Sequence, residues 1–95
     1  PLRYRVDHLL ADRGIAFEGD GAVKFRGPNA ARSFDMLQER EWHLRESGLV
    51  VARYGWKLAR HDRAQLADRF RIVIAATPIR DVPVWWYREV HRRRR

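Results

Sequence analysis

The sequence contains no cysteine, which excludes disulfide bonds and cysteine-bound zinc. A chain without cysteine fits a reducing compartment, so we expect a cytoplasmic protein. Any metal would need oxygen or imidazole ligands, and oxygen ligands favour hard ions such as Mg²⁺ or Mn²⁺. Long apolar runs are also missing: the longest, residues 72–76, falls far short of the roughly 20 residues that cross a bilayer. We therefore expect no membrane-spanning segment.

Lysine is scarce, although the chain is strongly basic. Lys24 and Lys57 are the only lysines among 20 basic residues, and 12 acidic residues leave a net charge of +8. A positive field of this size favours a polyanionic partner, with nucleic acid first and an anionic membrane surface second. The alternative is codon bias in a GC-rich genome, which raises the arginine content without any function.

The length of 95 residues indicates one small domain. Because the chain opens on Pro1 rather than Met, we expect a processed piece or one domain of a longer protein, whose other domains or subunits are further candidate partners. Residues 1–77 carry the periodic patterns of a folded core. Residues 78–95 differ, because aromatic residues and then a run of arginines replace those patterns.

The apolar patterns predict an α/β fold. We expect strands at residues 4–10 and 15–20, a turn at 11–14, a helix at about 30–47, a strand at 49–54 and a helix at 63–76. Gly14 suits the turn, Gly48 the end of the first helix, and Asp62 the start of the second. An extended segment at residues 22–25 could add a strand. A strand–helix–strand crossover in this order implies a mixed sheet with helices packed on it.

If the first two strands pair across the turn, Asp7 lies nearly opposite Glu18. Opposed residues on one face have Cβ atoms roughly 5 Å apart, so the two carboxylates repel unless a cation neutralises them. Mg²⁺ commonly takes one or two carboxylates plus water and a phosphate, which is what a metal-dependent nuclease needs. The alternative is that both acids are solvated and paired with Arg3, Arg5 or Arg26, in contacts that contribute little.

The order of short motifs resembles the PD-(D/E)xK nuclease superfamily, and within it the small endonuclease domains akin to very-short-patch-repair endonucleases. The likeness begins with Asp7, continues through Glu-Gly-Asp-Gly at residues 18–21 and reaches Lys24. It extends to LQEREWHL at residues 37–44 and SGLVVARYGW at residues 47–56. The resemblance implies a restriction-endonuclease-like mixed sheet and hydrolysis of DNA phosphodiester bonds with Mg²⁺ or Mn²⁺.

The resemblance also implies roles for individual residues. It makes Asp7, Glu18, Asp20 and Lys24 catalytic, with the metal held by Asp7, Glu18 and the backbone carbonyl of Gly19. This chain departs from the superfamily at two places: Asp20 occupies the position of its usual lysine, and Gln38 stands where relatives often have lysine. A nuclease fold without activity, kept as a nucleic-acid- or protein-binding module, is the alternative.

Further residues are candidates for contact with nucleic acid. They are Arg26, Gln38, Arg40, Arg45, Trp85 and Trp86. The helical arginines could hold phosphates, or Arg45 could pair with Glu41 one turn away. The tail tryptophans could stack on bases or wedge into a duplex, or they could cover a sheet edge or contact a partner protein. We expect the remaining tryptophans, Trp42 and Trp56, to pack in the core.

Overall fold

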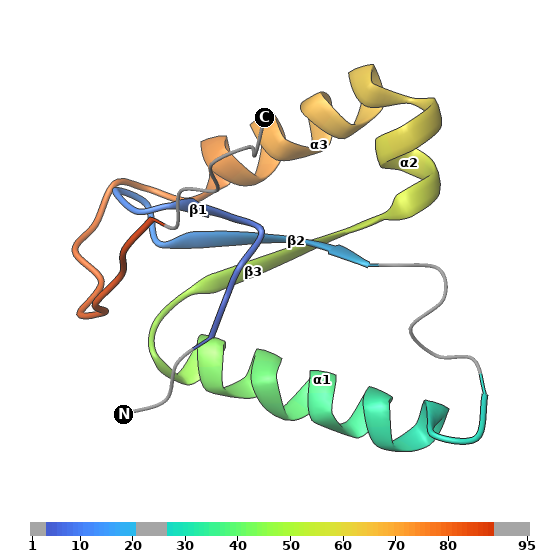
Figure 1. Ribbon diagram of the computed structural model, residues 1–95. Helices are drawn as coiled ribbons and strands as arrows, with labels where there is room; N and C mark the ends of the chain where they lie inside the picture. Colours follow the sequence, from blue (N-terminus) through green and yellow to red (C-terminus); the bar gives the residue numbers. More distant parts are fainter. Residues whose placement is uncertain (1–3, 21–26, 89–95) are drawn as a thin grey trace, which may run out of the picture.

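The computed structural model describes residues 4–20 and 27–88. Over these ranges a three-stranded sheet lies between α1 on one face and α2 and α3 on the other (Figure 1). The elements are β1 (His8–Leu10), β2 (Ile15–Asp20), α1 (Ala30–Glu46), β3 (Val50–Gly55), α2 (Trp56–His61) and α3 (Arg63–Ala76). Within the described ranges, every helix is too short or too polar to span a bilayer.

The sheet is mixed, with the order β1-β2-β3. β1 and β2 are antiparallel, with His8 opposite Phe17, whereas β2 and β3 are parallel, with Ile15 beside Val50 and Asp20 beside Gly55. Because parallel neighbours need a crossover, α1 lies between β2 and β3 in the chain. The α/β class and the strand–helix–strand crossover predicted from the sequence are confirmed, while the segment at residues 22–25 lies outside the described residues.

The first strand is shorter than predicted, beginning at His8 rather than at residue 4. The chain before it leaves the sheet and runs toward α1 (Figure 1). There the Tyr4 hydroxyl lies 2.5 Å from Nδ1 of His43, and the Arg40 guanidinium donates to the carbonyl of Arg5. Contacts with α1 thus replace strand pairing for Tyr4 and Arg5.

The helix ends follow their predicted signals. Gly48 takes a φ of +99° after α1, and the Asp62 carboxylate accepts the backbone N–H of Gln65 at 3.0 Å to begin α3. The prediction omitted α2, which follows β3 directly at Gly55 and has no side-chain cap. A helix of six residues is too short to show a helical period, which explains the omission.

The two faces of the sheet bury different residues. On the α1 side, Ala16, Leu44 and Leu49 form a buried cluster. On the α3 side, the ring of Phe70 packs 4.3 Å from that of Phe17, centroid to centroid. Phe34, near the start of α1, lies outside this core, because it is 47% exposed.

The C-terminal segment is attached to the turn between β1 and β2. The Arg80 backbone N–H donates to Asp12 at 2.9 Å, and its guanidinium donates to the carbonyls of Arg13 and Gly14. In return, Arg13 donates to the carbonyls of Ile74 and Thr77 at the end of α3. Two further residues of the segment, Val82 and Val84, pack against the buried cluster. Residues 80–84 therefore lie on the core.

Gly14 makes this attachment possible, and its replacement by alanine should be costly. It has a φ of +65°, and a Cβ there would overlap the Val82 side chain. Gly27 is the matched control, because its φ is also positive, at +95°, but a Cβ there meets no atom of the described residues within 4 Å. We expect Gly27→Ala to cost about 1 kcal/mol of unfolding free energy from backbone strain. Gly14→Ala should cost about 1–3 kcal/mol more from the overlap.

Chemical denaturation of the two variants measures the difference. Adding Val82→Ala to Gly14→Ala should reduce the excess cost, because it removes the overlapping methyl groups. Equal destabilisation by the two glycine variants would contradict the described docking of Val82 on the turn.

Candidate functional site

The end of the β1–β2 hairpin brings Asp7 and Glu18 together, as the predicted pairing requires. The backbone N–H of Asp7 donates to Oε2 of Glu18 at 3.3 Å. The backbone N–H of Gly19 donates to Oδ2 of Asp7 at 2.8 Å. Each acid thus accepts a backbone hydrogen bond from the opposite strand, and the carboxylate of Asp7 takes a donor that a longer β1 would otherwise have bonded.

Glu18 is buried, and its charge is balanced by α1. Only 5% of Glu18 is exposed, and Arg40 forms an ion pair with Oε1 of its carboxylate. The same guanidinium lies over the Tyr4 ring, 5.9 Å from the centroid. Arg40, predicted to hold phosphates, therefore has a carboxylate partner within the protein. The sequence-based alternative expected Glu18 to be solvated and paired with Arg3, Arg5 or Arg26; the structure instead has it buried and paired with Arg40.

A second ion pair lies between α1 and the sheet. Nε of Arg53 is 2.5 Å from Oε1 of Glu41, and Nη2 of Arg45 is 3.5 Å from the other oxygen of that carboxylate. Arg53 is the neighbour of Glu18 in the parallel register, so acids and arginines alternate across this interface. Sequence reasoning missed the role of Arg53. The signal was Glu41, which interrupts the apolar stripe of its helix.

Tyr54 is a further residue of the site that sequence reasoning missed. A Cβ on Gly19 would lie 3.0 Å from the Tyr54 ring, so the glycine leaves room for the tyrosine. Burial, followed by the negative charges of Asp7 and Glu18, raises the pKa of the Tyr54 phenol above its usual value of 10.0. The Tyr54 ring packs against Phe70 of α3, with ring centroids 5.4 Å apart, and its phenol stays protonated at neutral pH.

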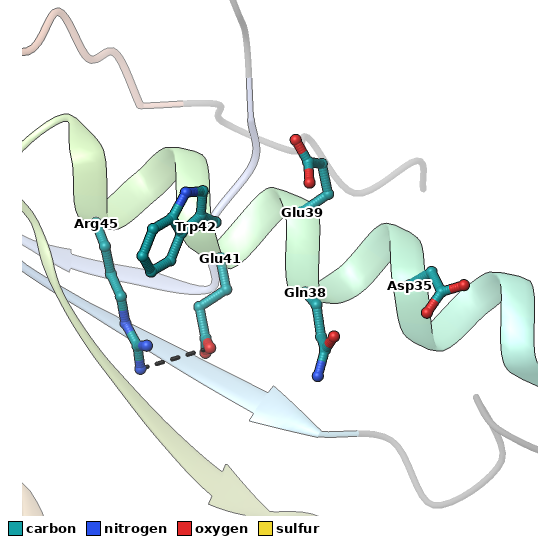
Figure 2. Close-up of a pocket in the computed structure, with 6 residues that line it drawn as sticks. All are labelled: Asp35, Gln38, Glu39, Glu41, Trp42 and Arg45. Carbon is teal, nitrogen blue, oxygen red and sulfur yellow. Dashed lines mark ion pairs between the residues drawn. The ribbon is translucent and has the colours of Figure 1, made fainter.

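Other predicted residues lie apart from the acids. Gln38 and Arg45 line a hollow on α1 together with Trp42 (Figure 2). The rest of its lining is acidic: Asp35, Glu39 and Glu41. With three carboxylates against one guanidinium, this hollow disfavours a phosphate. Trp42 is 59% exposed, which corrects its prediction as a core residue.

Trp85 and Trp86 lie at the other end of the sheet from Asp20. Trp85 follows Val82, which packs at the β1–β2 turn, and the length of β2, about 17 Å, separates that turn from Asp20. The tryptophans are 102% and 54% exposed. They form a surface separate from the acids, so the structure does not bring them to the candidate site.

The remaining predicted residues are Asp20, Lys24 and Arg26. Asp20 ends β2, beside Gly55 of β3, while Lys24 and Arg26 lie outside the described residues. Among the described residues, no group of three or more acidic or histidine side chains converges in a way that could hold a metal ion. Asp7 and Glu18 alone supply two carboxylates, which is the number of protein ligands that Mg²⁺ commonly takes.

Comparison of the chain with protein-family models, with curated proteins and with solved structures gives no match. The resemblance of its motifs to the PD-(D/E)xK nucleases therefore stays a prediction.

Removing Arg40 should destabilise the fold far more than removing Arg45. Arg40→Met leaves the buried Glu18 carboxylate without its counter-charge, which costs about 3 kcal/mol in comparable buried pairs. Arg45→Met removes the same charge from an exposed pair and should cost less than about 1 kcal/mol. Denaturant titration gives both values, and adding Glu18→Gln should recover part of the loss in Arg40→Met. Similar values for the two single variants would show that the Glu18–Arg40 contact contributes little.

Titration of tyrosine should report on the acids beside Tyr54. Because its pKa is raised in the folded state, the protonated phenol stabilises the fold below the unfolded pKa of about 10, and that contribution is lost as pH rises through the folded pKa. Phenolate absorbance should show a component above pH 10 that disappears in Tyr54→Phe. Asp7→Asn should move this component to lower pH. No movement in Asp7→Asn would mean that the Asp7 charge does not reach the phenol.

Proposed function

We propose that this chain is a restriction-endonuclease-like domain of the PD-(D/E)xK kind, which hydrolyses DNA phosphodiester bonds with Mg²⁺ or Mn²⁺. The observation that carries the proposal is the pair of carboxylates, Asp7 and Glu18, held side by side at the end of the hairpin. It is supported by the mixed sheet, whose parallel strand β3 follows the α1 crossover, and by the net charge of +8. The absence of cysteine supports a place in the cytoplasm.

The proposed roles divide among neighbouring groups. Asp7 and Glu18 would hold the ion, with the Gly19 carbonyl as a further oxygen ligand and Asp20 beside them. When bound, the ion would lower the pKa of a water molecule and stabilise the charge of the phosphate. Lys24 would stabilise the negative charge that develops on the phosphate oxygens. Tyr54, neutral beside the acids, can donate its hydroxyl proton to a hydrogen bond.

A second function, binding without cleavage, is favoured by the Glu18–Arg40 ion pair. The guanidinium already neutralises the carboxylate that a metal would need. Asp20 also favours binding without cleavage, because the superfamily usually has a lysine at this position. In this version the domain is a nucleic-acid- or protein-binding module, and the acid–arginine contacts serve only stability.

The effect of divalent ions on stability and on cleavage distinguishes the two proposed functions. If Asp7 and Glu18 hold one ion, Mg²⁺ or Mn²⁺ at about five times its dissociation constant should stabilise the native fold by about 1 kcal/mol. For a domain of this size, that free energy raises the melting temperature by about 4–8 °C. Asp7→Asn should remove the rise and the cleavage of DNA. Lys24→Ala should abolish cleavage but keep the rise, because Lys24 is assigned to the phosphate.

Asp35→Asn is the matched control, since it removes the same charge from an exposed residue of α1 that lines the acidic hollow. It should keep both the rise and the cleavage. If millimolar divalent ions do not raise the melting temperature of the native chain and the chain does not cleave DNA, the binding module becomes the better assignment.

A further inference from the structure

A small aromatic and cationic cluster lies on α2. Nearly half of Trp56, 46%, is exposed, although the sequence predicted a packing residue. The guanidinium carbon of Arg60 lies 4.8 Å from the centroid of its ring, in a cation–π contact. The ring of His61 meets it edge-on, with centroids 6.4 Å apart and an angle of 90° between the planes. The indole is thus held in place by its own helix while much of its surface faces solvent.

This cluster lies at the same end of the sheet as the candidate site, although α2 covers the face opposite to the one on which the Glu18 carboxylate meets Arg40 of α1. Trp56 directly follows Gly55, which pairs with Asp20 at the carboxyl ends of the parallel strands β2 and β3. Open α/β sheets bind their ligands beyond the carboxyl ends of parallel strands. From strand spacings, the backbone of Trp56 lies about 11 Å from that of Glu18.

The charge of the cluster is positive. Lys57, Arg60 and Arg63 are exposed there, and His61 adds charge when protonated. The acid among them, Asp62, accepts the N–H of Gln65 as the cap of α3. Within α2, Trp56 is the large apolar side chain that is exposed, since Leu58 is half-buried, so the surface lacks the contiguous apolar area expected of a protein-docking face.

We propose that this cluster, Trp56 with Lys57, Arg60 and Arg63, binds an unpaired stretch of nucleic acid next to the cleavage site. An unpaired base stacks on the exposed indole, and the three cations contact the flanking phosphates. Bases inside a duplex are already stacked on their neighbours and offer no free face to a side chain. The proposal rests on the nuclease function and adds a substrate class to it: DNA with a single-stranded segment rather than blunt duplex.

Binding of labelled oligonucleotides, measured by fluorescence anisotropy with a metal chelator present to prevent cleavage, tests the proposal. A single strand should bind at least about tenfold more tightly than a blunt duplex of the same length. Trp56→Ala should weaken single-strand binding about tenfold, since a stacked base contributes about 1–3 kcal/mol. Arg60→Gln should reduce the slope of log affinity against log salt by about 0.7, the value for one phosphate contact on a single strand.

Two controls match these variants. Trp42→Ala removes a tryptophan of similar exposure from the acidic hollow of α1, and Arg71→Gln removes an exposed arginine of α3 that pairs with Asp68. Both should bind single strands like the native chain. If Trp56→Ala does not fold, Trp56→Leu and Arg60→Gln decide the question.

Native-like single-strand binding by Trp56→Ala and Arg60→Gln, or equal affinity of the native chain for blunt duplex, would overturn the proposal. Different results would show that the nuclease function, rather than the binding surface, is wrong. Absence of Mg²⁺-dependent cleavage, together with weakened single-strand binding by Trp56→Ala, would leave a single-strand-binding module. Cleavage together with unaffected binding by Trp56→Ala would leave a nuclease without this binding surface.

Discussion

The buried carboxylate of Glu18 lies between the sheet and α1, and Arg40 supplies the opposite charge from the helix. A buried charge without a partner is costly, so this contact restricts how α1 can lie on the sheet. The pair of Arg53 and Glu41 repeats the same arrangement one strand further along. Together, the pairs fix the face of the helix and draw the N-terminal segment toward α1, which leaves Asp7 at the end of a short β1.

Several of the arginines have structural roles. Arg40 and Arg53 balance acids inside the protein, whereas Arg13 and Arg80 donate to backbone carbonyls that join the β1–β2 turn to α3 and to the C-terminal segment. Planar guanidinium groups with several donors suit such roles better than lysine does. These arginines explain part of the excess of arginine over lysine. The cations of α2 lie elsewhere, beside an exposed indole.

The two ends of the sheet have different characters. At the carboxyl ends of β2 and β3, the acids of the hairpin, Tyr54 and the cluster on α2 lie within a few residues of one another along the strands. At the opposite end, the β1–β2 turn holds the C-terminal segment with its exposed Trp85. Tryptophans that look alike in the sequence therefore belong to separate surfaces, and of Trp56 and Trp85 it is Trp56 that lies at the end of the sheet with the acids.

The sequence alone determined the α/β class, the pairing of Asp7 with Glu18 and the limits of α3, because strand alternation, a symmetric turn and a helix cap are local signals. It could not show α2, whose six residues are too few to reveal a helical period. Nor could it show that Arg40 pairs with Glu18, or that Trp56 is exposed while Tyr54 lies beside the acids. These contacts and exposures depend on residues far apart in the chain. They were therefore determined only by the packing of the helices on the two faces of the sheet.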